Sequence, residues 1–170
     1  EKGRDVRLRM VNAEYPVGES RHLIAEARER VRALDIGDAV EMDTRFLSDD
    51  AALGKLSSCD LVVFGYQKSA ESASGAVRYG LISGRPVAVT PLPIFSDVAP
   101  FSVELPGLSP EDMARGIEAM IDRLRGEGAA LDPDLSSMLE RARTHCDERS
   151  YAALGPRLKG MMTALWCDAG

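Results

Sequence analysis

The residue types best suited to chemistry lie in residues 69–80, which read SAESASGAVRYG. This stretch follows an apolar run, residues 61–66, and is rich in small side chains before a predicted helix. Small residues between a strand and a helix expose main-chain N–H groups at the positive end of the helix dipole, where phosphate binds well. The spacing alone fits a plain strand-to-helix connection, capped by Ser74, equally well. The loop therefore has two interpretations, an anion site and a simple connection.

Two apolar runs predict the strands that would position this loop. Residues 61–66 and 87–90 are almost wholly apolar and end at turn residues, which is the pattern of strands buried on both faces of a parallel sheet. Between them, Ser74 is expected to cap a helix that ends at Gly84 in the left-handed conformation. Parallel sheets bind ligands beyond the carboxyl ends of their strands, and the loop 67–74 follows such an end.

Strands and helices alternate along residues 6–125, and a helical tail follows over residues 132–168. Further strands are expected at residues 6–11, 39–42 and 101–105, with helices starting at Ser20, Ser48 and Ser109. A loop rich in proline is expected after residues 87–90, with Pro91, Pro93 and Pro100. Pro156 is expected to kink or start the last helix, and Gly126 to Pro133 to form a flexible joint. The pattern predicts an α/β fold, a Rossmann-like open parallel sheet with helices on both faces, in a single domain over residues 1–170.

The composition argues against several classes of protein. The net charge is −6, aromatic residues make up 5% of the chain and no basic stripe occurs, so we expect no nucleic-acid partner. The three cysteines are far apart and fit a reducing compartment: Cys59, Cys146 and Cys167. We expect no transmembrane segment and no signal peptide. The expected location is cytoplasmic, with peripheral binding to the inner membrane face as an alternative.

The segment CDLVVFGYQKSAESASGAVRYGLISGRPVAVTPLPIF, residues 59–95, resembles the C-terminal, donor-binding half of group 1 glycosyltransferases of the GT-B architecture. The likeness rests on the order of a buried strand, a loop with glutamate and glycine, a helix and a Gly-x-Pro-Val strand. It extends more weakly back to LRMVNAEYP, residues 8–16, and forward to the last helix. It therefore covers nearly the whole chain.

The resemblance implies roles for residues of the loop. Glu71 takes the place of the catalytic-site glutamate that contacts the donor sugar. The turn whose amides hold the diphosphate matches Ser72, Ala73, Ser74 and Gly75. Eight residues after Glu71, where the family has a second glutamate for the ribose, this chain has Tyr79. A tyrosine hydroxyl can hydrogen-bond a ribose but supplies no charged acceptor.

The resemblance also implies parts that this sequence does not contain. In the family, an N-terminal domain binds the acceptor, and a first strand–helix unit of the C-terminal half carries cations for the diphosphate. Residues 6–13 match the second strand of that half. We therefore expect a fragment that is inactive alone and whose partner is the missing N-terminal domain of the same protein.

The function implied by the resemblance is nucleotide-sugar binding in a retaining, hexosyl-type glycosyltransferase, which transfers a sugar from a nucleoside-diphosphate sugar to an acceptor. Preorganised amides would stabilise the charge that grows on the departing diphosphate, and Glu71 would orient the sugar. No metal or other cofactor is expected. The alternatives are a non-catalytic α/β interaction module and a GT-B-related sugar-nucleotide epimerase, for which no acid–base carboxylates are evident. The sugar, the base and the acceptor stay open.

Other residues with chemical potential have simpler interpretations. His22 and His145 are predicted to be surface residues, since neither has partners at metal-ligand spacing. Arg78 is predicted to face solvent, with a reach to phosphate as the alternative, and Cys59 to be a core thiol. Four methionines are predicted core residues: Met120, Met138, Met161 and Met162.

Overall fold

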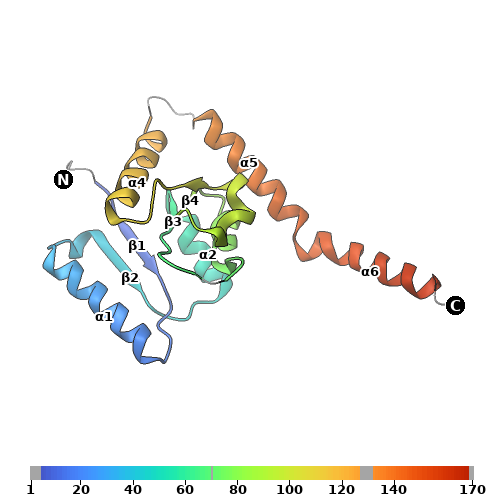
Figure 1. Ribbon diagram of the computed structural model, residues 1–170, viewed down its shortest axis with the longest axis horizontal. Coiled ribbons are helices and arrows are strands. Elements are labelled where there is room, and N and C mark those ends of the chain that lie inside the picture. The colour runs from blue at the N-terminus through green and yellow to red at the C-terminus, as the bar shows by residue number, and fades with distance from the viewer. Residues whose placement is uncertain (1–4, 70, 127–131, 169–170) are drawn as a thin grey trace. The chain divides into compact units, whose positions relative to one another are not determined.

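The computed structural model describes residues 5–69, 71–126 and 132–168 (Figure 1). Contacts divide the chain into two compact units, residues 1–55 and 56–170, and each unit is described by itself. A single domain over residues 1–170 stays a prediction.

The first unit contains a parallel strand–helix–strand arrangement. β1 (Leu8–Val11) is followed by α1 (Gly18–Ala33), a short 3-10 helix η1 (Gly37–Ala39) and β2 (Val40–Asp43). The two strands pair in parallel, from Leu8 opposite Val40 to Val11 opposite Asp43. Parallel pairing needs a long crossover, which α1 supplies.

α1 begins earlier than the sequence predicts. Ser20 was the expected cap, but the helix begins at Gly18, after Val17, whose side chain makes no capping hydrogen bond. The Ser20 Oγ instead accepts a hydrogen bond from the Tyr15 N–H at 3.1 Å. The predicted cap is therefore wrong, because this serine bonds to the segment before the helix from a position inside the first turn.

The second unit is built on a 3-stranded parallel sheet in the order β3–β4–β5. Its strands are β3 (Val62–Phe64), β4 (Val87–Val89) and β5 (Val103–Glu104). α3 (Gly75–Ile82) connects β3 to β4, and a second 3-10 helix, η2 (Pro93–Phe101), connects β4 to β5. In both units, every strand pair among the described residues is parallel, as predicted.

The remaining helices are α2 (Asp49–Ser57), α4 (Pro110–Leu124), α5 (Pro133–Glu148) and α6 (Tyr151–Asp168). α2 contains the division between the two units, and the other three belong to the second unit. Of the joint expected at Gly126 to Pro133, residues 127–131 lie outside the described residues.

Helices cover both faces of the sheet in the second unit. Val87 and Val89 of β4 pack with α3 and η2 in one hydrophobic cluster. Side chains alternate along a strand, so Ala88 points to the opposite face, together with its cross-strand partner Val103. Val103 packs against a second cluster formed by α4 and α5. The predicted Rossmann-like arrangement, with helices on both faces of a parallel sheet, is confirmed.

Local signals fix the ends of α3 and α4 as predicted. The Ser74 Oγ accepts a hydrogen bond from the Val77 N–H at 3.3 Å and caps α3. Ser109 caps α4 in the same way, through the Asp112 N–H at 3.1 Å. Gly84, just after α3, has a φ of +72°, a conformation in which a glycine avoids the strain of a Cβ atom.

The proline-rich segment after β4 is the main local surprise. A loop was expected there, but the segment forms η2 and buries Ile94, Phe95 and Val98. Pro93 begins this helix with a φ that its ring already restricts to helical values. The prolines therefore start a short helix that packs on β4, where we had expected irregular structure.

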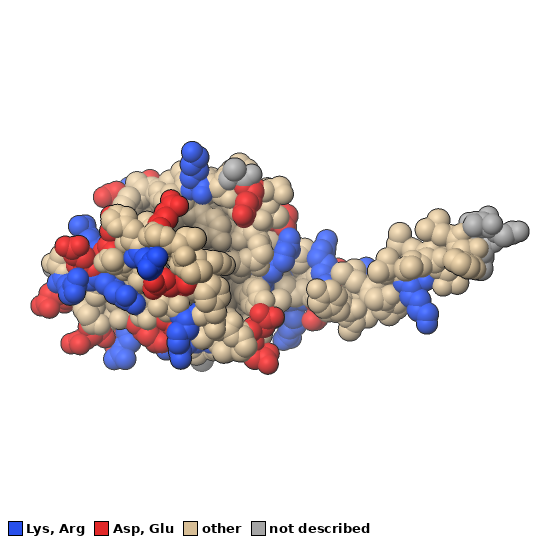
Figure 2. Space-filling model, turned by 90° about the horizontal axis from the view of Figure 1, so that it is seen from below, with Lys and Arg blue, Asp and Glu red and all other residues tan. Residues whose placement is uncertain are grey.

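α6 differs from the prediction in its start and in its burial. It begins at Tyr151 and continues through Pro156, so the proline does not start the helix. Met161 and Met162 are 65% and 63% exposed, so the prediction that they are core residues is wrong, whereas Met120 and Met138 are buried as predicted. Charged side chains are spread over much of the surface but are sparse along α6 (Figure 2). None of the helices within the described ranges has both the length and the hydropathy that a bilayer crossing requires.

Candidate functional site

The loop between β3 and α3 contains main-chain donors that are not used within the described chain. The Glu71 N–H donates to the Ser69 Oγ at 3.2 Å. Among the residues described, the next N–H groups, at Ser72, Ala73, Ser74 and Gly75, have no acceptor. Gly75 is the first residue of α3, so these donors lie at the positive end of the helix. The turn thus contains several N–H groups that an anion could accept from.

The hydroxyl of Ser74 has a different role from the N–H groups around it. Ser74 is only 2% exposed, and its Oγ accepts from the Val77 N–H at the start of α3. The Tyr66 hydroxyl lies 3.3 Å from the same Oγ. The side chain of Ser74 is therefore committed to holding the turn, and only its main chain is suited to contact a ligand.

Two residues that the sequence did not single out anchor the start of the loop. Thr90, at the end of β4, is fully buried, and its Oγ1 donates to the Tyr66 carbonyl at 2.7 Å. Its N–H donates to the Phe64 carbonyl at 3.1 Å, which extends the pairing of β3 with β4 beyond the strands. The sequence signal for this anchor was a tyrosine and a threonine, each at the end of one of the two neighbouring apolar runs.

The other predicted ligands are separate from this anchor. Glu71 is exposed in the loop, and Tyr79 is half-buried in the second turn of α3. The Arg78 Nη2 lies 2.6 Å from the Asp97 Oδ2, so Arg78 is paired within the second unit. The structure therefore brings the amide turn together with its cap, and it places Glu71 in the exposed part of the loop that directly precedes the predicted diphosphate residues.

A charged cluster in the first unit was not predicted. The buried carboxylate of Asp43, at the end of β2, receives two hydrogen bonds from the Arg45 guanidinium, at 2.9 and 2.7 Å. The Lys55 Nζ lies 2.8 Å from Glu41 and 3.2 Å from Asp43. The hydrogen bonds from Arg45 hold the pKa of Asp43 well below its usual range. The sequence signal for this cluster was the alternation of Glu41, Asp43 and Arg45 at the end of the strand predicted at residues 39–42.

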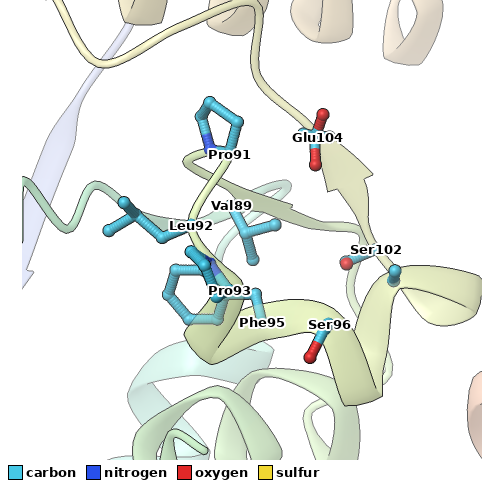
Figure 3. Close-up of a pocket in the computed structure, with 9 residues that line it drawn as sticks. Val89, Pro91, Leu92, Pro93, Phe95, Ser96, Ser102 and Glu104 are labelled. Atoms are coloured by element: carbon cyan, nitrogen blue, oxygen red, sulfur yellow. The ribbon is translucent and has the colours of Figure 1, made fainter. Parts of the chain in front are cut away.

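A pocket of about 370 Å³ lies beside η2, near the ends of β4 and β5 (Figure 3). Its lining is mainly apolar, and its polar members are Ser96, Ser102 and Glu104. The Ser102 hydroxyl donates to the Val98 carbonyl at 3.0 Å, so it is left to act only as an acceptor toward a ligand. None of the donor-binding residues that the sequence analysis predicted lines this pocket. It is formed by η2, which the sequence analysis missed.

His145 is half-buried, whereas we predicted a surface residue. Its ring packs against Phe101 in a tilted arrangement with a centroid distance of 4.2 Å, and its Nδ1 lies 3.1 Å from the Arg149 guanidinium. Its Nε2 is buried and has no hydrogen-bond partner in the described part of the chain. Burial, followed by the charges of Arg149 and Arg78, lowers the pKa of His145. The described residues include no group of three or more His, Cys, Asp and Glu placed to hold a metal ion.

A parallel sheet covered by helices on both faces, with a small-residue turn at a strand's carboxyl end, is the architecture of doubly wound nucleotide-binding folds. The chain has the fold of the C-terminal half of a GT-B glycosyltransferase, as the resemblance predicted. No protein-family model matches the sequence, and no curated protein matches it. The solved structures that carry the fold assignment have low sequence identity.

One such structure is HepE from Anabaena in complex with UDP, with a TM-score of 0.66 and 12% identity over 87% of this chain. Another is sucrose-phosphate synthase from Thermosynechococcus elongatus, with a TM-score of 0.69 and 12% identity over 95% of this chain. HepE in complex with UDP and glucose also matches, with a TM-score of 0.66 and 10% identity. This chain spans 38% of the length of HepE and 39% of that of the synthase.

Proposed function

We propose that this chain binds the nucleoside diphosphate of a nucleotide sugar and forms the donor-binding part of a glycosyltransferase. The observation that carries the proposal is the group of N–H donors at residues 72–75 that have no acceptor among the described residues, beyond the carboxyl end of β3 and at the start of α3. The fold supports the ligand class, because a solved structure that shares it holds UDP.

The proposed chemistry follows from the kind of donor in this turn. When a glycosyl bond to a nucleoside diphosphate breaks, negative charge grows on the departing diphosphate. N–H groups fixed by a capped helix stabilise that charge without having to reorganise during the reaction. The helix dipole adds to this stabilisation at short range. The turn is therefore proposed to bind the leaving group, both before and after transfer.

Glu71 is proposed to contact the donor sugar next to this turn. It is exposed and directly precedes the diphosphate residues, so its carboxylate can accept hydrogen bonds from sugar hydroxyls. Such a contact orients the sugar ring and does not transfer a proton. Tyr79 is proposed to contact the ribose. A retaining, hexosyl-type transfer, an acceptor site in a separate N-terminal domain, independence from metal ions and a cytoplasmic location complete the proposal.

The test is a titration of the ¹⁵N-labelled chain with UDP and with GDP, followed through the backbone amide shifts. We expect the largest shifts at residues 72–75, because their N–H groups would donate to the phosphates. The start of α4 is the matched control: it is also capped by a serine, but Glu111 and Asp112 lie in its first turn and repel an anion. If neither nucleotide shifts residues 72–75 more than residues 111–113, the proposed function is wrong.

A further inference from the structure

The loop that carries the proposed diphosphate donors is tied at both ends through one residue, Tyr66. At the start of the loop, the Tyr66 carbonyl accepts a hydrogen bond from the buried Thr90 Oγ1 at 2.7 Å. At the end of the loop, the Tyr66 hydroxyl lies 3.3 Å from the Oγ of Ser74. The main chain and the side chain of the same tyrosine thus fix the two ends of residues 67–73.

The ring of Tyr66 is held in place independently of these hydrogen bonds. It packs against Phe95 with a centroid distance of 5.1 Å and against Phe64 with a centroid distance of 6.3 Å. Phe95 is a buried member of the hydrophobic cluster on this face of the sheet. Because the core holds the ring, the Tyr66 hydroxyl has a fixed position, and its hydrogen bond to Ser74 restrains the Ser74 side chain.

The contact bears directly on the N–H donors of the turn. The Ser74 Oγ bonds to both Tyr66 and the Val77 N–H, so Tyr66 and the first turn of α3 hold the same atom. We propose that Tyr66 is a positioning residue, which fixes the N–H groups of residues 72–75 in the arrangement that a diphosphate requires. This inference rests on the proposed function and names the residue that preorganises its site.

Preorganisation gives the expected size of the effect. A turn that is ordered before binding loses less conformational freedom when the ligand arrives, so its affinity is higher. Removal of one neutral hydrogen bond changes a free energy by an amount that corresponds to about a two- to tenfold change in an equilibrium constant. The ring itself would stay packed in Tyr66→Phe, because phenylalanine keeps every aromatic contact of the tyrosine.

The experiment compares the wild-type chain with Tyr66→Phe and with Tyr151→Phe. Tyr151 is 97% exposed, so its substitution controls for the loss of a tyrosine hydroxyl as such. Binding of UDP and of inorganic pyrophosphate is measured for each, together with the urea midpoint and the ¹⁵N relaxation of residues 72–75 without ligand. We expect Tyr66→Phe to weaken both ligands by the same factor, about two- to tenfold. We also expect faster motion of residues 72–75 and a cooperative urea transition whose midpoint falls only slightly, because one hydrogen bond is lost while the ring stays packed.

The double variant Ser74→Ala, Tyr66→Phe completes the test. Once the Ser74 hydroxyl is absent, Tyr66→Phe is expected to change pyrophosphate affinity no further, because the two residues act as one pair. If Tyr66→Phe binds both ligands as the wild type does, or weakens UDP but not pyrophosphate, the inference is overturned and the proposed function stands. If the wild-type chain binds neither UDP nor pyrophosphate, the proposed function is overturned together with the inference.

Discussion

At the scale of single residues, His145 provides a prediction about pH. Burial lowers its pKa from the ordinary value of 6.5, so the folded protein binds this proton less readily than the unfolded chain does. The stabilisation is complete above pH 6.5 and is lost as the pH falls through the lowered pKa of the folded state. We expect His145→Phe, which keeps a ring against Phe101, to reduce the fall in the free energy of unfolding between pH 7 and pH 5.

The measurement is urea unfolding at both pH values for the wild type, His145→Phe and the control His22→Phe. The side chain of His22 in α1 is 74% exposed, so its substitution controls for the replacement of an imidazole by a phenyl ring away from the core. An equal loss of stability in His145→Phe and the wild type would contradict the prediction. The partial burial of His145 was also predictable, because Leu135, Met138 and Ala142 on α5 continue at helical spacing to residue 145.

At the scale of secondary-structure elements, α3 lies close to β3 and β4 at Gly80. A Cβ atom at this position would lie 2.8 Å from Cε2 of Phe64 and 3.2 Å from Cγ2 of Val87. Val87 is buried in the hydrophobic cluster, and the partly buried Phe64 packs against it. We therefore expect Gly80→Ala to lower the free energy of unfolding by about 1–3 kcal/mol, as overpacking of a core does.

Gly160→Ala in α6 is the matched control, because a Cβ atom there meets nothing within 4 Å. Alanine favours a helix over glycine, so this change should leave the urea midpoint unchanged and raise the helical content slightly. The prediction fails if Gly80→Ala is as stable as the wild type. A smaller but real loss with displaced Phe64 resonances would mean that the ring moves aside.

The elements that the sequence predicted well are those with local causes. Ser74, Ser109 and Gly84 fix helix ends through bonds or backbone conformations within a few residues, so their positions follow from the sequence. η2 and the pairing of Tyr66 with Ser74 depend on packing between β3, β4 and the segment after β4. Such contacts bring together residues that are distant in the sequence, and no local pattern contains them. The sequence predicted the turn between β3 and α3 because the signal for it is local. It did not predict the contacts of Tyr66 and Thr90 that hold the turn.

At the scale of the whole molecule, the alternation of apolar strands and helices was enough to predict parallel pairing and cover on both faces of the sheet, because short buried strands have few other solutions. It was not enough to predict how much of the helical tail is buried. α5 and α6 both show apolar residues at helical spacing, but only α5 contributes buried residues to the clusters among the described residues. A periodic stripe indicates a helix face that can pack, without identifying what packs on it.

This contrast leads to a prediction about stability. Leu158 and Trp166 of α6 are 60% and 85% exposed, so Leu158→Gln and Trp166→Gln remove almost no packing. We expect each to change the free energy of unfolding by about 0.5 kcal/mol or less, as is usual at the surface. Leu135 of α5 is 1% exposed, and Leu135→Ala should cost about 2–5 kcal/mol because it leaves a cavity in the second cluster. Urea unfolding followed by far-ultraviolet circular dichroism measures all three variants without depending on Trp166 fluorescence. A midpoint for Leu158→Gln as low as that for Leu135→Ala would mean that α6 is packed in solution.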